Sequence, residues 1–96
     1  MTTATATRMP QALIDQRRAT RRRLRIWARL RNEARARWVA AFNAIDNHAT
    51  EEANEPAARA FHRSGDLLFW IQKRVEAAID NDNAAEAAQF AALRGR

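Results

Sequence analysis

One stretch decides how this chain folds: RRATRRRLRIWARLRNEARARW, residues 17–38. It places ten arginines among 22 residues, with leucine, isoleucine and tryptophan set between them. No glycine or proline interrupts it, and arginine, alanine and leucine all favour the helical state. The stretch therefore predicts an α-helix, in which the apolar and the basic residues must face different surroundings.

The apolar residues of the stretch recur every three or four positions, which is the spacing of one helix face. From residue 24 onward they form a seam, interrupted by Arg31: Leu24, Trp27, Ala34, Trp38, Ala41 and Ile45. Toward the N-terminus the same spacing meets polar residues, at Thr20 and Arg17. The chain between residues 10 and 47 contains no helix breaker after Pro10, so the sequence predicts one long helix over 10–47.

Most of the arginines lie away from this seam. At 100° per residue, a 4-3-4 spacing gathers four of them about 180° from the seam: Arg18, Arg22, Arg25 and Arg29. Arg21 and Arg23 flank this row. The only local acids are Asp15 and Glu33, so pairs along the helix cannot neutralise the basic side. We expect Arg18, Arg21, Arg22, Arg25 and Arg29 to bind an acidic partner.

Charge is unevenly distributed along the chain. Residues 1–37 carry eleven arginines against two acids, a net charge of +9, whereas residues 38–96 carry six basic and nine acidic groups, a net charge of −3. The basic part would be attracted to polyanions. The predicted partner is therefore nucleic acid or an acidic protein surface.

The second half of the chain predicts further helices. We expect a connection over 47–54 and a second helix over 55–80, with a seam of its own: Ala57, Phe61, Ser64, Leu68, Ile71, Val75 and Ala78. Gly65 could break that helix in two. Asn83 with Glu86 three residues later resembles a capping box, which predicts a short third helix over 84–93 that ends at Gly95.

These elements predict an all-α fold. We expect an antiparallel helical hairpin of two long helices closed by the short third, in one domain over 10–96, after a disordered arm over 1–9. The predicted core is Trp27, Trp38, Phe42, Ile45, Phe61, Leu68, Ile71 and Val75. The first helix would overhang the second, so a homodimer could cover its exposed end.

A second candidate surface lies in the second helix. Trp70 shares a helix face with Arg59, Arg63 and Arg74, and Phe69 precedes it. An aromatic ring flanked by arginines suits an interface or a base-stacking site. The alternative is that Phe69 and Trp70 receive the third helix through its own apolar residues. A helix-turn-helix with its turn at Gly65 is a further reading, although its second helix would begin with apolar residues instead of base-reading ones.

Several function classes find no support in the residues. Cysteine is absent, and neither His48 nor His62 has neighbours with metal-ligand spacing, so we expect no metal and no cofactor. Ser64, His62 and Asp66 are the residue types of a catalytic triad. Within one helical turn, however, their side chains point in different directions and cannot act together. We therefore expect a protein that is not an enzyme. Apolar runs are too short to span a membrane and no secretory signal is apparent, which favours the cytoplasm.

Two main hypotheses of function remain, and a structural role in a virion or nucleoid is a third possibility. In the first, a small non-enzymatic protein grips the nucleic-acid backbone with its arginine-rich helix. In the second, the chain is a protein-binding module or inhibitor that docks on an acidic or nucleic-acid-binding surface of a larger complex. Sixteen arginines against one lysine indicate a GC-rich genome, so such an inhibitor would be encoded by a bacterium or a phage.

Overall fold

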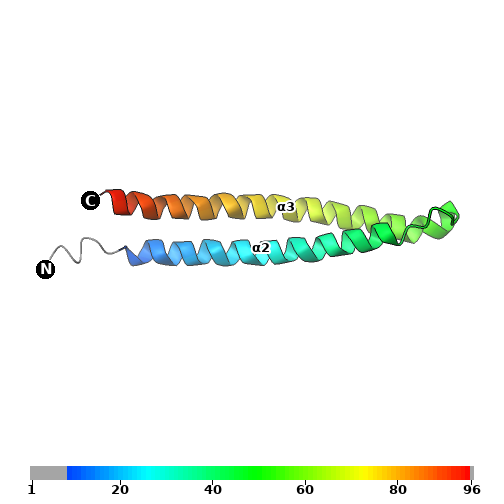
Figure 1. Ribbon diagram of the computed structural model, residues 1–96, viewed down its shortest axis with the longest axis horizontal. Helices are drawn as coiled ribbons and strands as arrows, with labels where there is room; N and C mark the ends of the chain where they lie inside the picture. Colours follow the sequence, from blue (N-terminus) through cyan, green and yellow to red (C-terminus); the bar gives the residue numbers. More distant parts are fainter. Residues whose placement is uncertain (1–8, 96) are drawn as a thin grey trace. The chain divides into compact units, whose positions relative to one another are not determined.

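A computed structural model describes residues 9–95 of the chain. It contains two long helices, α2 (Gln11–Asn43) and α3 (Glu51–Arg94), joined by residues 44–50 (Figure 1). The all-α prediction is confirmed, since no strand occurs in the part of the chain that the structure describes. The arm predicted over 1–9 lies outside that part, except for Met9.

The predicted third helix is wrong. Residues 84–93 continue α3 without a break, and so do the residues around Gly65, which excludes the helix-turn-helix reading. Asn81, Asp82 and Asn83 indicate a helix boundary, but each such residue costs a helix less than about 1 kcal/mol relative to alanine. Packing along one face of α3 outweighs that cost.

The start of α3 also differs from the prediction. The helix begins at Glu51, four residues before the predicted start, because Thr50 caps it: its Oγ1 accepts a hydrogen bond from the Ala53 N–H at 3.1 Å. Pro56 stands within the second turn. At that position proline removes one backbone hydrogen bond and its ring crowds the carbonyl of Glu52, yet the helix runs through it.

The seams of both helices are longer than the sequence suggested. In α3 the 4-3 spacing runs on through polar residues, and none of its members is exposed: Ala57, Phe61, Ser64, Leu68, Ile71, Val75, Ala78, Asp82, Ala85, Gln89 and Ala92. In α2 the members from Leu13 to Ala41, Arg17 and Arg31 among them, are likewise all buried or half-buried. This seven-residue repeat is the pattern of coiled-coil packing.

The chain forms two compact units, each built from one stretch of each helix. The first unit comprises Met1–Ile26 with Glu76–Arg96, and the second comprises Trp27–Val75. Within the first unit the stretches are antiparallel, since Gln89 contacts the backbone of Leu13 while Asp82 contacts Thr20. Ala78 and Ala85 are its buried apolar residues.

Aromatic residues hold the second unit together. The rings of Trp38 and Phe61 stack with centres 5.4 Å apart, and those of Trp27 and Trp70 meet edge to face at 5.7 Å, again in antiparallel order. The hairpin connection is closed by two hydrogen bonds, from the Asp46 N–H to Asn54 Oδ1 at 2.9 Å and from Asn54 Nδ2 to the Asp46 carbonyl at 2.6 Å. The predicted antiparallel pairing of two long helices is thus confirmed within each unit.

The predicted core is confirmed in part. Ile71 and Val75 are buried, whereas Phe42 is 60% exposed, because it lies one residue before the end of α2 with the Phe61 ring beside it. The others are half-buried, since two helices leave the flanks of a seam open: Trp27, Trp38, Ile45, Phe61 and Leu68. The overhang that motivated a homodimer is absent, because α3 extends far enough to cover the start of α2 in the first unit.

Candidate functional site

Arg17 occupies an interior seam position of the first unit, where its side chain is 11% exposed. Its Nε lies 3.1 Å from Asp82 Oδ1, its Nη2 lies 2.7 Å from Glu86 Oε2, and its Nη1 donates to Gln89 Oε1 at 3.3 Å. Thr20 Oγ1 also donates to Asp82 Oδ1, at 2.8 Å. We call Arg17, Thr20, Asp82, Glu86 and Gln89 the polar seam cluster. It satisfies a charge that would otherwise be costly in the interior.

The exposed arginines of the first unit have no such partners. Arg18, Arg22 and Arg25, which we call the basic face, are exposed, and none forms an ion pair with another residue among 9–95. Their spacing places them on the side of α2 opposite its seam. The sequence predicted this exposure, and the structure agrees with it.

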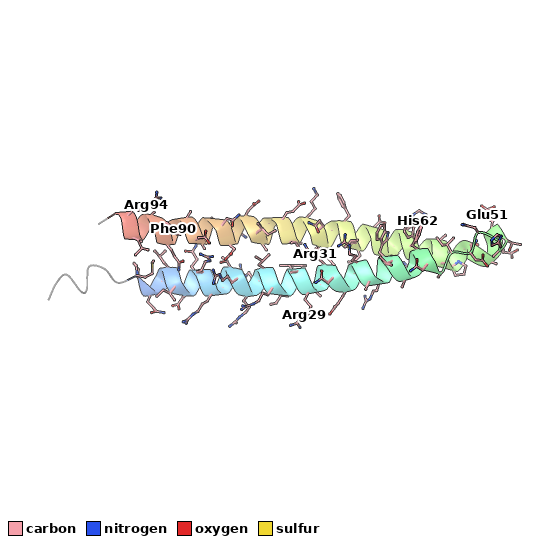
Figure 2. All side chains as sticks on the ribbon, in the orientation of Figure 1. Arg29, Arg31, Glu51, His62, Phe90 and Arg94 are labelled. Atoms are coloured by element: carbon pink, nitrogen blue, oxygen red, sulfur yellow. The ribbon has the colours of Figure 1, made fainter. Side chains whose placement is uncertain are left out.

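Arg21 and Arg29 stand in different settings. Arg21 is exposed and borders a hollow of about 310 Å³ that Glu86 and Phe90 also line, so an acidic group lies near it. Arg29 belongs to the second unit, is exposed and points away from α3 (Figure 2). The structure therefore gathers three of the five predicted arginines on one face of the first unit.

The charge of the first unit is divided between its two helical stretches. Residues 11–26 of α2 carry six arginines and one acid, Asp15, for a net charge of +5. On α3, two of the unit's carboxylates, those of Asp82 and Glu86, are engaged by Arg17. The basic face thus keeps its positive potential, which attracts a polyanion.

In the second unit the candidate residues of α3 divide between two flanks. The Trp70 ring meets Trp27, and the guanidinium carbon of Arg74 lies 5.1 Å from its centre. Arg59 Nη1 lies 3.8 Å from Glu55 Oε1, and Arg63 is exposed. Phe69, one residue before Trp70 and so about 100° round the helix, borders a groove instead. The two rings that the sequence grouped together thus serve different surfaces.

That groove, of about 530 Å³, was not predicted. We call it the Phe69 groove, and it is lined by Arg31, Arg35, Trp38, Gly65, Leu68, Phe69 and Gln72. Gly65 lets the Trp38 indole approach α3, since a Cβ at residue 65 would stand 3.2 Å from Trp38 Nε1. The sequence shows a glycine at residue 65 and a tryptophan at residue 38. That the two lie opposite each other follows only from how the two helices pair.

Arg31 contrasts with Arg17. It also occupies a seam position and is half-buried, on the side of α2 that faces α3 (Figure 2). Within residues 9–95, however, no carboxylate lies within ion-pair distance of its guanidinium, and no side-chain hydrogen bond joins it to another residue. Its donors are therefore available to an anion in the groove.

The residue types of a catalytic triad in α3 make local contacts. The Ser64 hydroxyl donates to the Ala60 carbonyl at 2.7 Å, within its own helix, and His62 lies exposed beside the Phe61 ring. The described residues contain no group of three or more side chains able to hold a metal ion. Nor does any helix among them combine the length and apolarity needed to cross a bilayer.

Comparisons with known proteins give no guide to function. No protein-family model, curated protein or solved structure shows significant similarity to the chain. The basic face and the Phe69 groove are therefore the features of this chain that bear on its function.

Proposed function

We propose that this protein binds the backbone of nucleic acid through the basic face, Arg18, Arg22 and Arg25, with Arg21 and Arg29 as further contacts. One observation carries the proposal. Arg17 engages Asp82 and Glu86, whereas no carboxylate of the described chain pairs with the three arginines of the basic face. Three unpaired guanidinium groups on successive turns of one helix match a row of phosphates.

The physical basis is electrostatic. Each phosphate that an arginine neutralises releases condensed counterions, so affinity falls steeply as salt rises. Arginine also donates two parallel hydrogen bonds to phosphate oxygens. Such contacts position a protein on nucleic acid without reading its bases, so we expect little sequence preference. The proposal needs no catalysis, metal or cofactor.

The test compares two variants of equal charge. The first carries Arg18→Gln, Arg22→Gln and Arg25→Gln, and the matched control carries Arg37→Gln, Arg63→Gln and Arg94→Gln, all exposed positions outside the basic face. Fluorescence anisotropy with a labelled 20-base-pair duplex would be measured across a salt series. We expect the first variant to lose at least about ten-fold in affinity and to reduce the log–log salt slope by about 2–3.

The control variant should keep most of its affinity for the duplex and most of its salt slope. If the two variants lose affinity and slope equally, binding reflects net charge alone and the basic face is not the site. If the wild-type chain does not bind nucleic acid at low salt, the proposed function is wrong.

A second candidate function is docking on an acidic protein surface. It is favoured by Trp70, which is half exposed, packs on Trp27 and lies beside the Arg74 guanidinium, because tryptophan and arginine are frequent interface anchors. Pull-down from lysate with and without nuclease separates the two functions. Capture of a protein that survives nuclease and is lost with Trp70→Ala would favour this second one.

A further inference from the structure

The Phe69 groove combines three kinds of chemistry in one place. Arg31 and Arg35 supply two guanidinium groups, and within residues 9–95 neither forms an ion pair with a carboxylate. Phe69 supplies an aromatic ring that is 66% exposed. Gln72 and the Trp38 indole supply hydrogen-bonding groups, and neither makes a side-chain hydrogen bond within the described chain.

This combination selects a particular class of ligand. The guanidinium groups require an anion, the ring requires a flat partner, and the amide and indole can pair with polar edges. A volume of about 530 Å³ lies within the range of small-molecule sites. A nucleotide offers all three features, because its base is flat with polar edges and its phosphate is anionic.

We propose that the Phe69 groove holds an unpaired nucleotide of a single-stranded nucleic acid. The base stacks on Phe69, and the phosphate lies against Arg31 and Arg35. This inference rests on the proposed function, since it takes nucleic acid as the partner, and it adds a preference for single strands. A base within a duplex is stacked on both faces and paired along its edge, so it cannot enter a groove of this kind.

Lys73 determines which face of the Phe69 ring a base can use. The Lys73 ammonium lies 5.2 Å from the centre of the Phe69 ring. A further cation beside a stacked nucleotide favours the adjoining phosphate. Because that ammonium lies over one face of the ring, the base stacks on the other face, and the groove itself takes its positive charge from Arg31 and Arg35 of α2.

The first experiment removes the ring and compares it with a matched phenylalanine. Phe69→Ala and Phe90→Ala each delete a largely exposed ring of α3, but Phe90 does not line the groove. Affinity would be measured for a ten-nucleotide thymidine single strand and for a ten-base-pair duplex. We expect Phe69→Ala to weaken single-strand binding about ten-fold, as alanine does at base-stacking rings, and duplex binding less than two-fold. Phe90→Ala should change either affinity by less than two-fold.

The second experiment narrows the groove without removing a contact. Gly65→Ala puts a Cβ 3.2 Å from Trp38 Nε1, and alanine favours the helix, so the fold should be kept. We expect single-strand affinity to fall several-fold while helicity by circular dichroism is unchanged. Arg31→Gln should in turn lower the single-strand salt slope by about 0.7.

The outcomes separate this inference from the proposed function. If Phe69→Ala matches Phe90→Ala, or weakens duplex and single strand alike, the groove is not a nucleotide site, whereas the basic face stands as long as its own variant loses binding. If the basic-face variant binds normally while Phe69→Ala loses single-strand affinity, the groove stands and the proposed face fails. A wild-type chain that binds neither nucleic acid overturns both.

Discussion

The two units accommodate an arginine in the seam of α2 in different ways. Each has an arginine at an interior seam position of α2, Arg17 in the first unit and Arg31 in the second. Arg17 meets Asp82, Glu86 and Gln89 across the seam, whereas Arg31 borders an open groove beside Gly65. The role of a seam arginine is therefore set by the residues of α3 that lie opposite it.

This difference indicates how the alignment of the two helical stretches is fixed in each unit. In the first unit, small buried alanines and a charged cluster leave little apolar area to define one alignment of the helices. A buried polar pair can fix register because any slip leaves its charges unpaired. In the second unit, stacked rings such as Trp38 on Phe61 supply shape-specific contacts, so no charged pair is required there.

The largest effect should follow from breaking the polar seam cluster. Arg17→Leu leaves Asp82 and Glu86 without their cation, so we expect the free energy of unfolding to fall by about 3 kcal/mol, the lower end for a buried pair because Glu86 is half exposed. Urea denaturation measures this. Arg18→Leu, one residue on and exposed, is the control and should change stability by at most about 0.5 kcal/mol. Equal losses of stability for Arg17→Leu and Arg18→Leu would show that Arg17 is not part of the core.

A somewhat smaller effect is expected in the second unit. Trp38→Ala removes the ring stacked on Phe61, and because Trp38 is only half-buried we expect a loss of about 2 kcal/mol, below the 3–5 kcal/mol of a fully buried tryptophan. Phe69→Ala, with a ring 66% exposed, is the control and should cost less than about 1 kcal/mol. An unchanged unfolding curve for Trp38→Ala would contradict the aromatic account of this unit.

Much of this architecture could be predicted, and the failures have identifiable causes. The spacing predicts the α2 seam back through Thr20 and Arg17, whereas the predicted α3 seam ends at Ala78 because the Asn- and Asp-rich residues 81–83 indicate a helix boundary. Continuing the same spacing would have placed Asp82 and Gln89 opposite Arg17 and removed the need for a third helix. Thr50 is a favoured capping residue, but Pro56 in the second turn favours a later helix start, so the sequence alone does not place the start of α3 at Glu51. The groove could not be predicted, since it depends on which residue of α2 faces Gly65.

For Arg31, the other seam arginine, we expect replacement to raise stability instead of lowering it. Arg31→Leu removes a half-buried charge that has no carboxylate partner in the described chain and adds apolar area to the seam, so stability should rise by about 1 kcal/mol. The melting temperature measures it, with Arg35→Leu, which is exposed, as the control. A loss of stability would show that Arg31 has a structural role like that of Arg17.

The smallest effect on stability should come from the basic face. Replacing Arg18, Arg22 and Arg25 by glutamine removes exposed charges that repel one another, so the melting temperature should stay the same or rise slightly. Nucleic-acid affinity should nevertheless fall, as argued above. If the variant unfolds, these arginines support the fold and cannot be assigned to binding alone.

The central claim, that the polar seam cluster fixes the alignment of the two helical stretches of the first unit, is tested most directly by a double-mutant cycle. Arg17→Ala, Asp82→Ala and the double variant would be compared by urea denaturation. The account predicts a coupling free energy of about 2 kcal/mol, because the pair is mostly shielded from solvent at 3.1 Å. Strictly additive effects, with a coupling below about 0.5 kcal/mol, would contradict it.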